Sequence, residues 1–505
     1  MLKTFQLQIE KGEFWYGGAN FDAPDMPFGE TTEFSNDLLT NNRYNQVSSY
    51  LISTKGRCIY NDGFNLDIKN GVITLYYDGI DPILETVGTT LKDAYDYVTA
   101  NYFKPDGKVP PKEFFVKPQF NTWMALGRDQ TEKGIREYVE NLKQGGYPCG
   151  VFMIDSEWAK YYGSYTFDKD KYDDPKALIA YLKECGYKVM LWESPFITPS
   201  TPEYRELLAG DMFVKGADGK VAIREWWEGF NPVLDMSNPK TVEWLEKKNK
   251  ALIDLGVDGF KLDAGDIEYY RDDDITYGKV KAREQCKLWS EFGAKYAYNE
   301  FRGSFNMGGR ALCQRQADKW HNWKLHGISV IVPEIIVQGL MGYYYTCPDM
   351  VGGGSIGTDK EFDQEFFVRF CEASALMPMM QFSASPWTRL TPKNNEICLK
   401  YANLHVSFGD YIYNLAINSS KTGVPIVRHL DYQYPNQGFE TELNSFMLGD
   451  DYLVSPVVEK GAVTKTLRLP QGKWRYEPDG VIYEGGQEIT VSAPLEVLPY
   501  FKKID

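Results

Sequence analysis

One short stretch of the chain, residues 256–266, reads GVDGFKLDAGD and carries the residue types and spacing of a reactive site. Its apolar residues form a run typical of a buried strand in a parallel sheet, and Asp263 ends that run. Ala264 and Gly265 follow, and a small residue before a glycine lets the chain turn close to a ligand. Because carboxylates at the C-terminal ends of strands face the mouth of a βα-barrel, the stretch predicts a reactive carboxylate at Asp263. A helix cap is the alternative interpretation.

The composition indicates which ligands to expect. The 35 Tyr, 28 Phe and 12 Trp are a high aromatic load, and aromatic faces stack on the C–H faces of sugars. A large β-rich core would also raise the aromatic content. The net charge of −15 argues against nucleic acid and anionic membrane surfaces, since both attract basic proteins. We therefore expect neither nucleic acid nor a membrane as a partner.

Metal ligands and cysteines add little chemistry. The four His are too few and too scattered for a His-based metal cluster, so we expect no metal and no cofactor. The acidic run 272–274 is interpreted as solvated surface, with calcium as the alternative. The eight Cys form no C-x-x-C pair and resemble buried free thiols, which favours a reducing compartment. Residues 1–11 lack an apolar signal run, so we expect a cytoplasmic protein unless a secretory signal has been removed.

The first 112 residues predict an antiparallel β domain. Runs of alternating polarity occur at 6–10, 66–68 and 72–77, and turn signals lie between them at 61–63 and 69–71. A helix is expected over 90–103, and the Pro- and Gly-containing segment 104–111 reads as a linker. At 505 residues the chain exceeds what one hydrophobic core supports, so further domains must follow.

From about residue 113 strands and helices alternate, which is the rhythm of parallel βα units. Helices are predicted at 130–143, 174–185 and 239–255, the last opened by Asn238 and Pro239. The predicted strands are 119–124, 150–155, 188–193, 257–262, 311–318, 342–349, 377–383 and 424–428. Eight strands in this length predict a (β/α)8 TIM barrel over residues 113–430. Short strands and turn glycines over 431–505 predict a C-terminal antiparallel β domain, so the fold class is α/β, a barrel flanked by two β domains.

Three groups of residues, in this order along 113–505, resemble glycoside hydrolase family 31. The first is Lys261-Leu262-Asp263-Ala264-Gly265-Asp266 in the place of the nucleophile motif, with Asp266 where the family usually carries Glu. The second is 339–342 followed by 348–353, which resembles the sixth strand and its glycine turn. The third is the tail at 446–457, 469–474, 485–486 and 494–495. The resemblance implies a retaining, exo-acting α-glycosidase that uses two Asp residues and no metal.

Retaining chemistry needs a nucleophile and a protonated acid/base about 5–5.5 Å apart, and it proceeds through a covalent glycosyl-enzyme. The resemblance assigns the nucleophile to Asp263. It places the acid/base Asp some fifty to sixty residues later, after the fifth strand, which selects Asp318. Ala317 and Lys319 on either side depart from the family pattern. A surface helix cap is the alternative for Asp318. Glu300 is a weaker candidate for the acid/base, because it is expected to lie before that strand and not after it.

The sugar is inferred from Lys261, which precedes Asp263 by two residues, and from Asp155 and Trp158. Together they resemble the galactose-binding arrangement of related α-galactosidase families, although Ser156 replaces the second Asp of that motif. An ammonium and a carboxylate can grip the axial O4 and the O6 of galactose by charge-assisted hydrogen bonds. The resemblance is therefore to the subgroup of family 31 that contains bacterial α-galactosidases and the myogenesis-regulating glycosidase, and we expect an α-galactosidase.

Other residues complete the predicted site. Trp123, Trp158 and Trp192 end successive strands and wall the sugar, unless they are core residues. Arg315 binds a hydroxyl or tunes a carboxylate, with a structural ion pair as the alternative. Asp349, at the end of the sixth strand, is expected in the pocket. Ser383 lies where glucose-specific members carry the His of an Arg-x-His pattern, after the seventh strand.

The expected partner is an oligosaccharide or glycoconjugate with a terminal α-linked sugar. α-Glucosidase or α-xylosidase activity on the same scaffold is one alternative. A sugar-binding barrel without catalysis is another, since fold does not imply function. A homo-oligomer is left open by the sequence.

Overall fold

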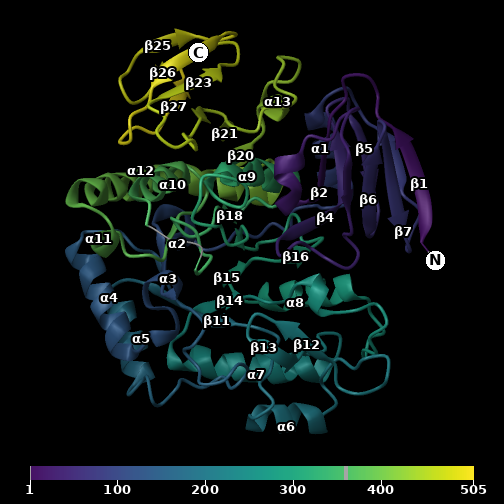
Figure 1. The fold of residues 1–505 in the computed structure, drawn as a ribbon, viewed down its shortest axis with the longest axis vertical. Coiled ribbons are helices and arrows are strands. Elements are labelled where there is room, and N and C mark those ends of the chain that lie inside the picture. The colour runs from purple at the N-terminus through teal and green to yellow at the C-terminus, as the bar shows by residue number, and fades with distance from the viewer. Residues whose placement is uncertain (1, 358–361) are drawn as a thin grey trace.

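The computed structural model describes residues 2–357 and 362–505. Figure 1 shows a central barrel, with the N-terminal strands on one side of it and the C-terminal strands at one end. The long helix α12 (Pro392–Thr422) runs between the barrel and the C-terminal sheet. In the part of the chain that the structure describes, no helix is long and apolar enough to cross a membrane. All eight Cys are free thiols, and seven of them are buried.

The N-terminal strands form two antiparallel sheets, in the orders β1-β7-β6-β3 and β4-β5-β8 with β2 also on β4. Strong alternation of buried and exposed residues in β6 explains why this region was predicted as β structure. The strands are β1 (Lys3–Gln8), β2 (Trp15–Ala19), β3 (Phe34–Asn36), β4 (Gln46–Ser53), β5 (Arg57–Tyr60), β6 (Phe64–Lys69), β7 (Val72–Tyr77) and β8 (Ile83–Thr86), and the helices that follow are α1 (Leu91–Asn101) and α2 (Glu113–Val116).

The barrel consists of eight parallel strands in the order β18-β17-β15-β14-β11-β10-β9-β19. Its ends are joined by Met350, just after β18, which bridges to Gln381 of β19. The predicted (β/α)8 barrel is therefore confirmed. The strands are β9 (Gln119–Asn121), β10 (Val151–Ile154), β11 (Lys188–Glu193), β14 (Gly259–Leu262), β15 (Tyr298–Phe301), β17 (Gln314–Arg315), β18 (Thr346–Cys347) and β19 (Gln381–Phe382).

One predicted barrel strand was wrong and another was missed. The segment 424–428 holds β20 (Val427–Arg428), which pairs antiparallel with β21 (Phe446–Leu448) in the C-terminal sheet. The true fifth strand, β15, was overlooked because its central residues Asn299 and Glu300 are polar, although both are buried inside the barrel. Glu300 therefore lies in a strand and not before one. Asp318, Asp349 and Ser383 consequently follow the sixth, seventh and eighth strands, each one later than expected.

Strand β14, which Asp263 follows directly, is packed closely against its neighbour. A Cβ atom on Gly259 of β14 would lie 1.8 Å from the backbone oxygen of Tyr298 in β15, so only glycine allows this approach. The preceding helix α7 (Pro239–Leu255) begins as predicted, because the Asn238 side chain accepts a hydrogen bond from the Lys240 N–H and Pro239 occupies the first turn. The helix ends at Gly256, whose φ of 120° is accessible to glycine.

Helices cover the outside of the barrel, and a hairpin of two strands projects from the segment between β11 and β14. The helices are α3 (Trp123–Leu126), α4 (Glu132–Gln144), α5 (Pro175–Glu184), α6 (Pro202–Ala209), α7, α8 (Ala282–Gly293), α9 (Ile331–Leu340), α10 (Gln364–Ala375), α11 (Pro386–Arg389) and α12. The hairpin strands are β12 (Ile223–Trp226) and β13 (Gly229–Pro232). Trp123 begins α3 and does not end a strand, contrary to prediction.

The C-terminal region forms an antiparallel sheet in the order β20-β21-β22-β27-β24-β25 and a two-stranded ribbon of β23 and β26. Its own apolar cluster includes Trp474 and Phe501, both fully buried. This confirms the predicted β structure at this end of the chain. Besides β20 and β21, the elements are α13 (Leu430–Gln433), β22 (Tyr452–Val454), β23 (Thr464–Arg468), β24 (Lys473–Tyr476), β25 (Ile482–Glu484), β26 (Glu488–Ser492) and β27 (Tyr500–Lys503).

The N-terminal sheet is joined to the barrel by hydrogen bonds. Strand β4 pairs in parallel with β16 (Ser304–Phe305), a short strand that follows β15. The buried Gln46 side chain donates to the carbonyl oxygens of Arg302 and Arg315, the latter at 2.9 Å. Because both arginines lie at strand ends of the barrel, the N-terminal sheet supports the residues around the predicted site.

Candidate active site

A cavity of about 350 Å³ opens at the C-terminal ends of the barrel strands. Seven of the ten predicted site residues line it: Trp123, Asp155, Trp192, Lys261, Asp263, Arg315 and Asp318. Residues that were not predicted also line it, among them Tyr44, Arg128, Ser156, Trp227, Glu228, Arg302, Met350, Gly354, Ser355 and Ile356. The cavity therefore brings together two prospective catalytic carboxylates, four cations and several aromatic rings.

Asp263 is held by three donors at the end of β14. Its Oδ2 accepts a hydrogen bond from Trp192 Nε1 at 3.1 Å, and its Oδ1 accepts from Arg302 Nε at 3.1 Å and from the Ala264 N–H at 3.0 Å. Burial raises the pKa of Asp263, but the charges of Arg302 and Lys261 outweigh burial and hold the pKa well below its usual range. The carboxylate is therefore fixed in position and ionised.

The turn after Asp263 is shaped by small residues. Ala264 has a φ of 55°, in the left-handed region. A Cβ atom on Gly265 would lie 1.9 Å from Cδ1 of Trp289 in α8, so the loop packs directly on that helix. Asp266, which stands in place of the usual Glu, is fully buried and accepts from Arg302 Nη2 at 2.8 Å and from Asn42 Nδ2 at 3.1 Å.

Asp318 shares one guanidinium with Asp349. Nη1 of Arg315 lies 2.6 Å from an oxygen of each carboxylate. The Asp318 side chain is 43% exposed, whereas that of Asp263 is 12% exposed. Burial and the charge of Asp263 raise the pKa of Asp318, but Arg315 outweighs them and the pKa lies below its usual value. Asp318 is thus the more accessible carboxylate of the two.

Lys261 and Asp155 form a buried ion pair on the cavity wall, with Nζ 2.7 Å from Oδ2. The same Oδ2 accepts from Asn121 Nδ2 at 2.8 Å, and Oδ1 accepts from the Ser156 N–H at 2.8 Å. Burial lowers the pKa of Lys261, but Asp155 outweighs burial and raises the pKa above its usual value. The ammonium therefore stays charged beside Asp263.

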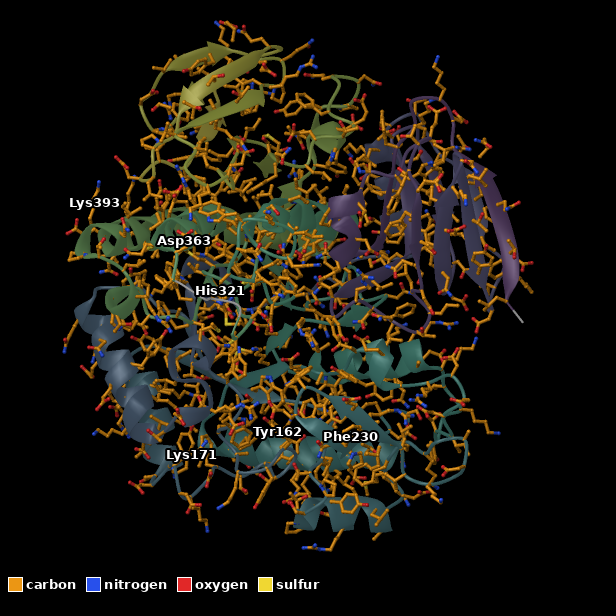
Figure 2. The ribbon with its side chains drawn as sticks, in the orientation of Figure 1. Tyr162, Lys171, Phe230, His321, Asp363 and Lys393 are labelled. Carbon is orange, nitrogen blue, oxygen red and sulfur yellow. The ribbon has the colours of Figure 1, made fainter. Side chains whose placement is uncertain are left out.

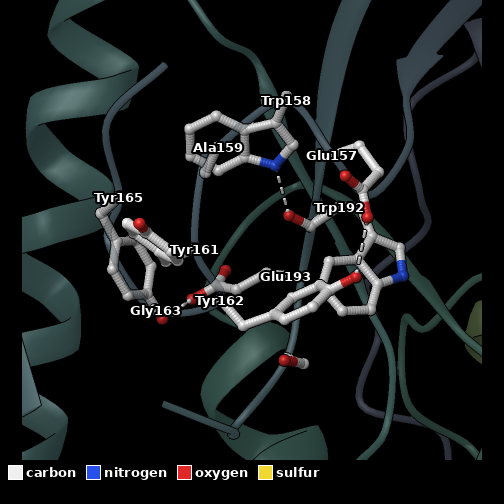
Figure 3. A pocket seen from close by; sticks show the side chains of 10 residues that line it. Glu157, Trp158, Ala159, Tyr161, Tyr162, Gly163, Tyr165, Trp192 and Glu193 are labelled. Atoms are coloured by element: carbon white, nitrogen blue, oxygen red, sulfur yellow. Dashed lines mark hydrogen bonds between the residues drawn. The ribbon is translucent and has the colours of Figure 1, made fainter. Parts of the chain in front are cut away.

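Three predicted site residues do not line the cavity. Trp158 is buried behind Trp192, donates Nε1–H to the Trp192 carbonyl at 2.8 Å, and lines a small neighbouring cavity (Figure 3). Asp349 is fully buried and supports the cavity indirectly, because it accepts hydrogen bonds from Arg315 and from the Gly354 N–H. Ser383 is fully buried and accepts from the Met124 N–H at 2.6 Å.

Lys319, which departs from the family pattern beside Asp318, forms a buried ion pair. Nζ of Lys319 lies 2.8 Å from Glu334 on α9 and 2.8 Å from the carbonyl of Ala317. The backbone N–H of Lys319 donates to Asp349 at 2.8 Å. This buried pair fixes the loop that carries Asp318.

The run 272–274 is only partly the solvated surface that was predicted. Asp274 has a side chain only 3% exposed and forms an ion pair with Arg224 of β12. Within residues 2–357 and 362–505, no group of His, Cys, Asp and Glu side chains could hold a metal ion.

Several of the residues that sequence reasoning missed come from outside the predicted strand ends. Tyr44 belongs to the N-terminal domain, and Trp227 and Glu228 form the turn of the β12–β13 hairpin. Arg302 immediately follows β15, so recognising that strand would have identified Arg302 as a strand-end residue. For Tyr44 the sequence holds no comparable signal, since it reaches the cavity through tertiary packing.

Comparison with known proteins agrees with this geometry. A family model described as the glycosyl hydrolases family 31 TIM-barrel domain matches residues 116–415, and one described as the family 31 C-terminal domain matches residues 423–505. The myogenesis-regulating glycosidase of Mus musculus is 29% identical, over 77% of this chain and 56% of its own. Alpha-glucosidase 2 of Bacillus thermoamyloliquefaciens is 26% identical, over 74% of this chain and 51% of its own. The chain thus spans about half the length of the curated relatives it matches.

Among solved structures, the GH31 dextranase FjDex31A of Flavobacterium johnsoniae, complexed with glucose, superposes with a TM-score of 0.87. It is 20% identical in sequence, and the match covers 99% of this chain and 66% of the dextranase chain. At 20% sequence identity, this similarity shows a shared fold and no more.

We predict that Lys261→Met destabilises the protein by about 3–5 kcal/mol, because Asp155 is left as an unpaired buried charge. The double variant Lys261→Met/Asp155→Asn should recover much of that loss, since it removes both charges. Chemical denaturation followed by tryptophan fluorescence measures the free energies of unfolding.

Lys250→Met is the matched control, because Lys250 pairs with Asp254 on the surface, where both side chains are more than 60% exposed. Its loss should stay below about 0.5 kcal/mol. A Lys261→Met variant as stable as this control would contradict the prediction.

Proposed function

This chain belongs to glycoside hydrolase family 31, and from that membership and the geometry of its cavity we propose that it is a retaining exo-α-glycosidase with a preference for α-galactosides. The observation that carries the proposal is the pair of carboxylates, Asp263 and Asp318, in one cavity with the Lys261–Asp155 ion pair. The substrate is an oligosaccharide or glycoconjugate with a terminal α-linked sugar.

Asp263 acts as the nucleophile in this proposal. It attacks the anomeric carbon, the bond to the leaving group breaks, and a covalent glycosyl-aspartate forms. A nucleophile must be ionised, and Arg302 and Lys261 keep the pKa of Asp263 well below its usual range. Trp192 donates to one oxygen and Ala264 to the other, which fixes the orientation of the carboxylate.

Asp318 acts as the acid and then as the base. It donates a proton to the departing oxygen in the first step, and it removes a proton from the attacking water in the second. Its exposed side chain can reach both the leaving group and incoming water. The competing idea of a sugar-binding barrel without catalysis is disfavoured, because both carboxylates line the same cavity.

The preference for galactose rests on Lys261. It lies two residues before Asp263 on β14, and residues two apart in a strand share a face. Both therefore face the cavity, and the ammonium with Asp155 presents a donor and an acceptor side by side. Such a pair can bind O4 and O6 of an axial-O4 sugar by charge-assisted hydrogen bonds. An equatorial O4 would lose its hydrogen bond to this buried pair.

α-Glucosidase and α-xylosidase activities are the second candidates. The match to an alpha-glucosidase favours α-glucosidase activity. The retaining mechanism itself serves all three sugars. Because this chain spans about half of that relative, the relative's activity does not transfer directly.

We predict that Asp263→Asn abolishes turnover while the fold is preserved, because the amide cannot form the glycosyl intermediate. Steady-state kinetics on a para-nitrophenyl α-glycoside, with circular dichroism for the fold, is the measurement. More than trace activity in this variant would show that another carboxylate is the nucleophile.

We predict that Asp318→Ala loses far more activity on substrates with poor leaving groups than on activated ones, because only poor leaving groups need protonation. Azide should restore turnover of an activated substrate in this variant and yield a glycosyl azide, since azide attacks without a general base. Equal losses on both substrate classes, without azide rescue, would exclude Asp318 as the acid/base.

We predict that the enzyme hydrolyses para-nitrophenyl α-galactoside faster than the α-glucoside and the α-xyloside, measured as kcat/KM. Where no water replaces the lost contact, an unpaired buried group costs several kcal/mol, on the order of 10⁴-fold in discrimination. Lys261→Met should remove most of the preference, because only the galactoside then loses a hydrogen bond to its O4. Faster hydrolysis of the α-glucoside by the wild type would reverse the assignment of the sugar.

A further inference from the structure

One buried side chain of the N-terminal domain contacts the backbone of two arginines of the site. Gln46, in β4, is fully buried between the N-terminal sheet and the barrel, where side chains fill the space (Figure 2). Its Nε2 carries two hydrogens and donates to the carbonyl oxygens of Arg302 and Arg315, the second at 2.9 Å. A single amide group therefore joins the ends of two barrel strands.

These two carbonyl groups lie where the pairing of the two strands stops. The pairing of β15 with β17 consists of Phe301 opposite Gln314, and the next residues along the chain are Arg302 and Arg315. Gln46 donates to the carbonyl of each of these next residues, in place of a continued ladder. Because a buried carbonyl needs a donor, this amide fixes how far apart the two strand ends lie.

The orientation of the Gln46 amide is determined by a chain of buried amides. Its Nε2 faces two carbonyl acceptors, so Oε1 faces the other way and accepts from Nε2 of Gln338 on α9 at 2.8 Å. Oε1 of Gln338 in turn accepts from Nε2 of Gln316 at 3.4 Å, and both of these residues are fully buried. A reversed Gln46 amide would place its oxygen against two carbonyl oxygens, so the network admits one orientation.

The side chains of the two arginines hold the two prospective catalytic carboxylates. Nε of Arg302 lies 3.1 Å from Oδ1 of Asp263, and Nη1 of Arg315 lies 2.6 Å from Oδ1 of Asp318. Both arginine side chains are buried, and packed interiors transmit displacements because they hold few voids. A shift of either strand end is therefore passed on to the carboxylate that its guanidinium binds.

We propose that Gln46 is a positioning residue that sets the separation of Asp263 and Asp318. The inference rests on the proposed function, because this separation matters only if the two carboxylates act as nucleophile and acid/base. A retaining mechanism requires about 5–5.5 Å between the two carboxyl groups. Gln46 contacts neither carboxylate and acts through Arg302 and Arg315. A displacement of about 1 Å at a reacting group can lower the rate about a hundred-fold.

The test uses Gln46→Met, which keeps the length of the side chain and removes its donors and its acceptor. kcat/KM is measured on the para-nitrophenyl and the methyl α-glycoside of the sugar that the wild type hydrolyses fastest. On the activated para-nitrophenyl substrate we expect about a ten-fold loss, because Asp263 is displaced. On the methyl glycoside the loss should be about ten-fold larger still, because the displaced Asp318 protonates the poor leaving group less effectively.

Ser48→Ala is the matched control. Ser48 lies two residues further along β4 on the same face, is fully buried, and donates to the carbonyl of Met341 at 3.0 Å. Its substitution also removes a buried hydrogen bond between the N-terminal sheet and the barrel, but at a residue that holds neither carboxylate. kcat/KM should be unchanged on both substrates. Denaturation curves of both variants define a temperature at which each is folded during the assay.

A second variant, Gln338→Met, leaves both donors of Gln46 in place and removes the partner that orients its amide. We expect a smaller loss than in Gln46→Met, again larger on the methyl glycoside than on the para-nitrophenyl glycoside. This variant decides the question if Gln46→Met does not fold.

Two outcomes would overturn the inference. Kinetics like those of Ser48→Ala, in Gln46→Met or in Gln338→Met, would mean that the amides only stabilise the domain interface. Equal losses on the two substrates would mean that Gln46 positions Arg302 alone and does not set the separation. A wild-type protein inert on every para-nitrophenyl α-glycoside would instead contradict the proposed function, and the role of Gln46 with it.

Discussion

The site depends on the compensation of buried charge by three cations, Lys261, Arg302 and Arg315. Lys261 pairs with Asp155, Arg302 links Asp263 to Asp266 in the loop after β14, and Arg315 links Asp318 to Asp349 and approaches Glu300. Six carboxyl groups surround the three cations, and burial raises the pKa of three of them, Asp266, Glu300 and Asp349. Asp263 stays ionised, and in the proposed mechanism its anion stabilises a positive, oxocarbenium-like transition state more than a neutral ground state.

This network also explains why the N-terminal domain belongs to the site. Asn42 donates to Asp266 and accepts from the Ile267 N–H, and the carbonyl of Tyr44 accepts from Arg302 Nη1 at 3.0 Å. Gln46 donates to the backbone oxygens of Arg302 and Arg315. A buried polar group left without its partner costs about 1–3 kcal/mol. Loss of this segment would therefore disturb Arg302, and through it Asp263, even though the barrel itself would be complete.

The sequence predicts best where pattern and burial agree. Strand β11 was expected at its observed bounds, and β14 and α7 were close, because a short apolar run or an Asn-Pro cap marks each of them. Strand β15 failed because Asn299 and Glu300 make it polar, and their partners lie on other strands: Glu300 accepts from Gln381 Nε2 at 2.7 Å. Ser383 directly follows β19 as a strand-end residue, whereas Trp158 lies four residues beyond β10 and does not end a strand, contrary to prediction, and neither side chain lines the cavity. The direction of a side chain at a strand end depends on the geometry of the following loop. That geometry cannot be predicted from the neighbouring residues in a single sequence.

The different surroundings of Asp263 and Asp318 account for the division of their proposed roles. Asp263 is nearly buried and bound by three donors, which stabilise its anion. In the proposed mechanism Asp318 carries a proton when the bond to the leaving group breaks, whereas Arg315 holds its pKa below the usual value. A sugar bound in the cavity would displace water from the 43% exposed side chain, and desolvation raises the pKa of a carboxyl group. Substrate binding would therefore act against Arg315 and favour protonation of Asp318, while Asp263 is already largely desolvated.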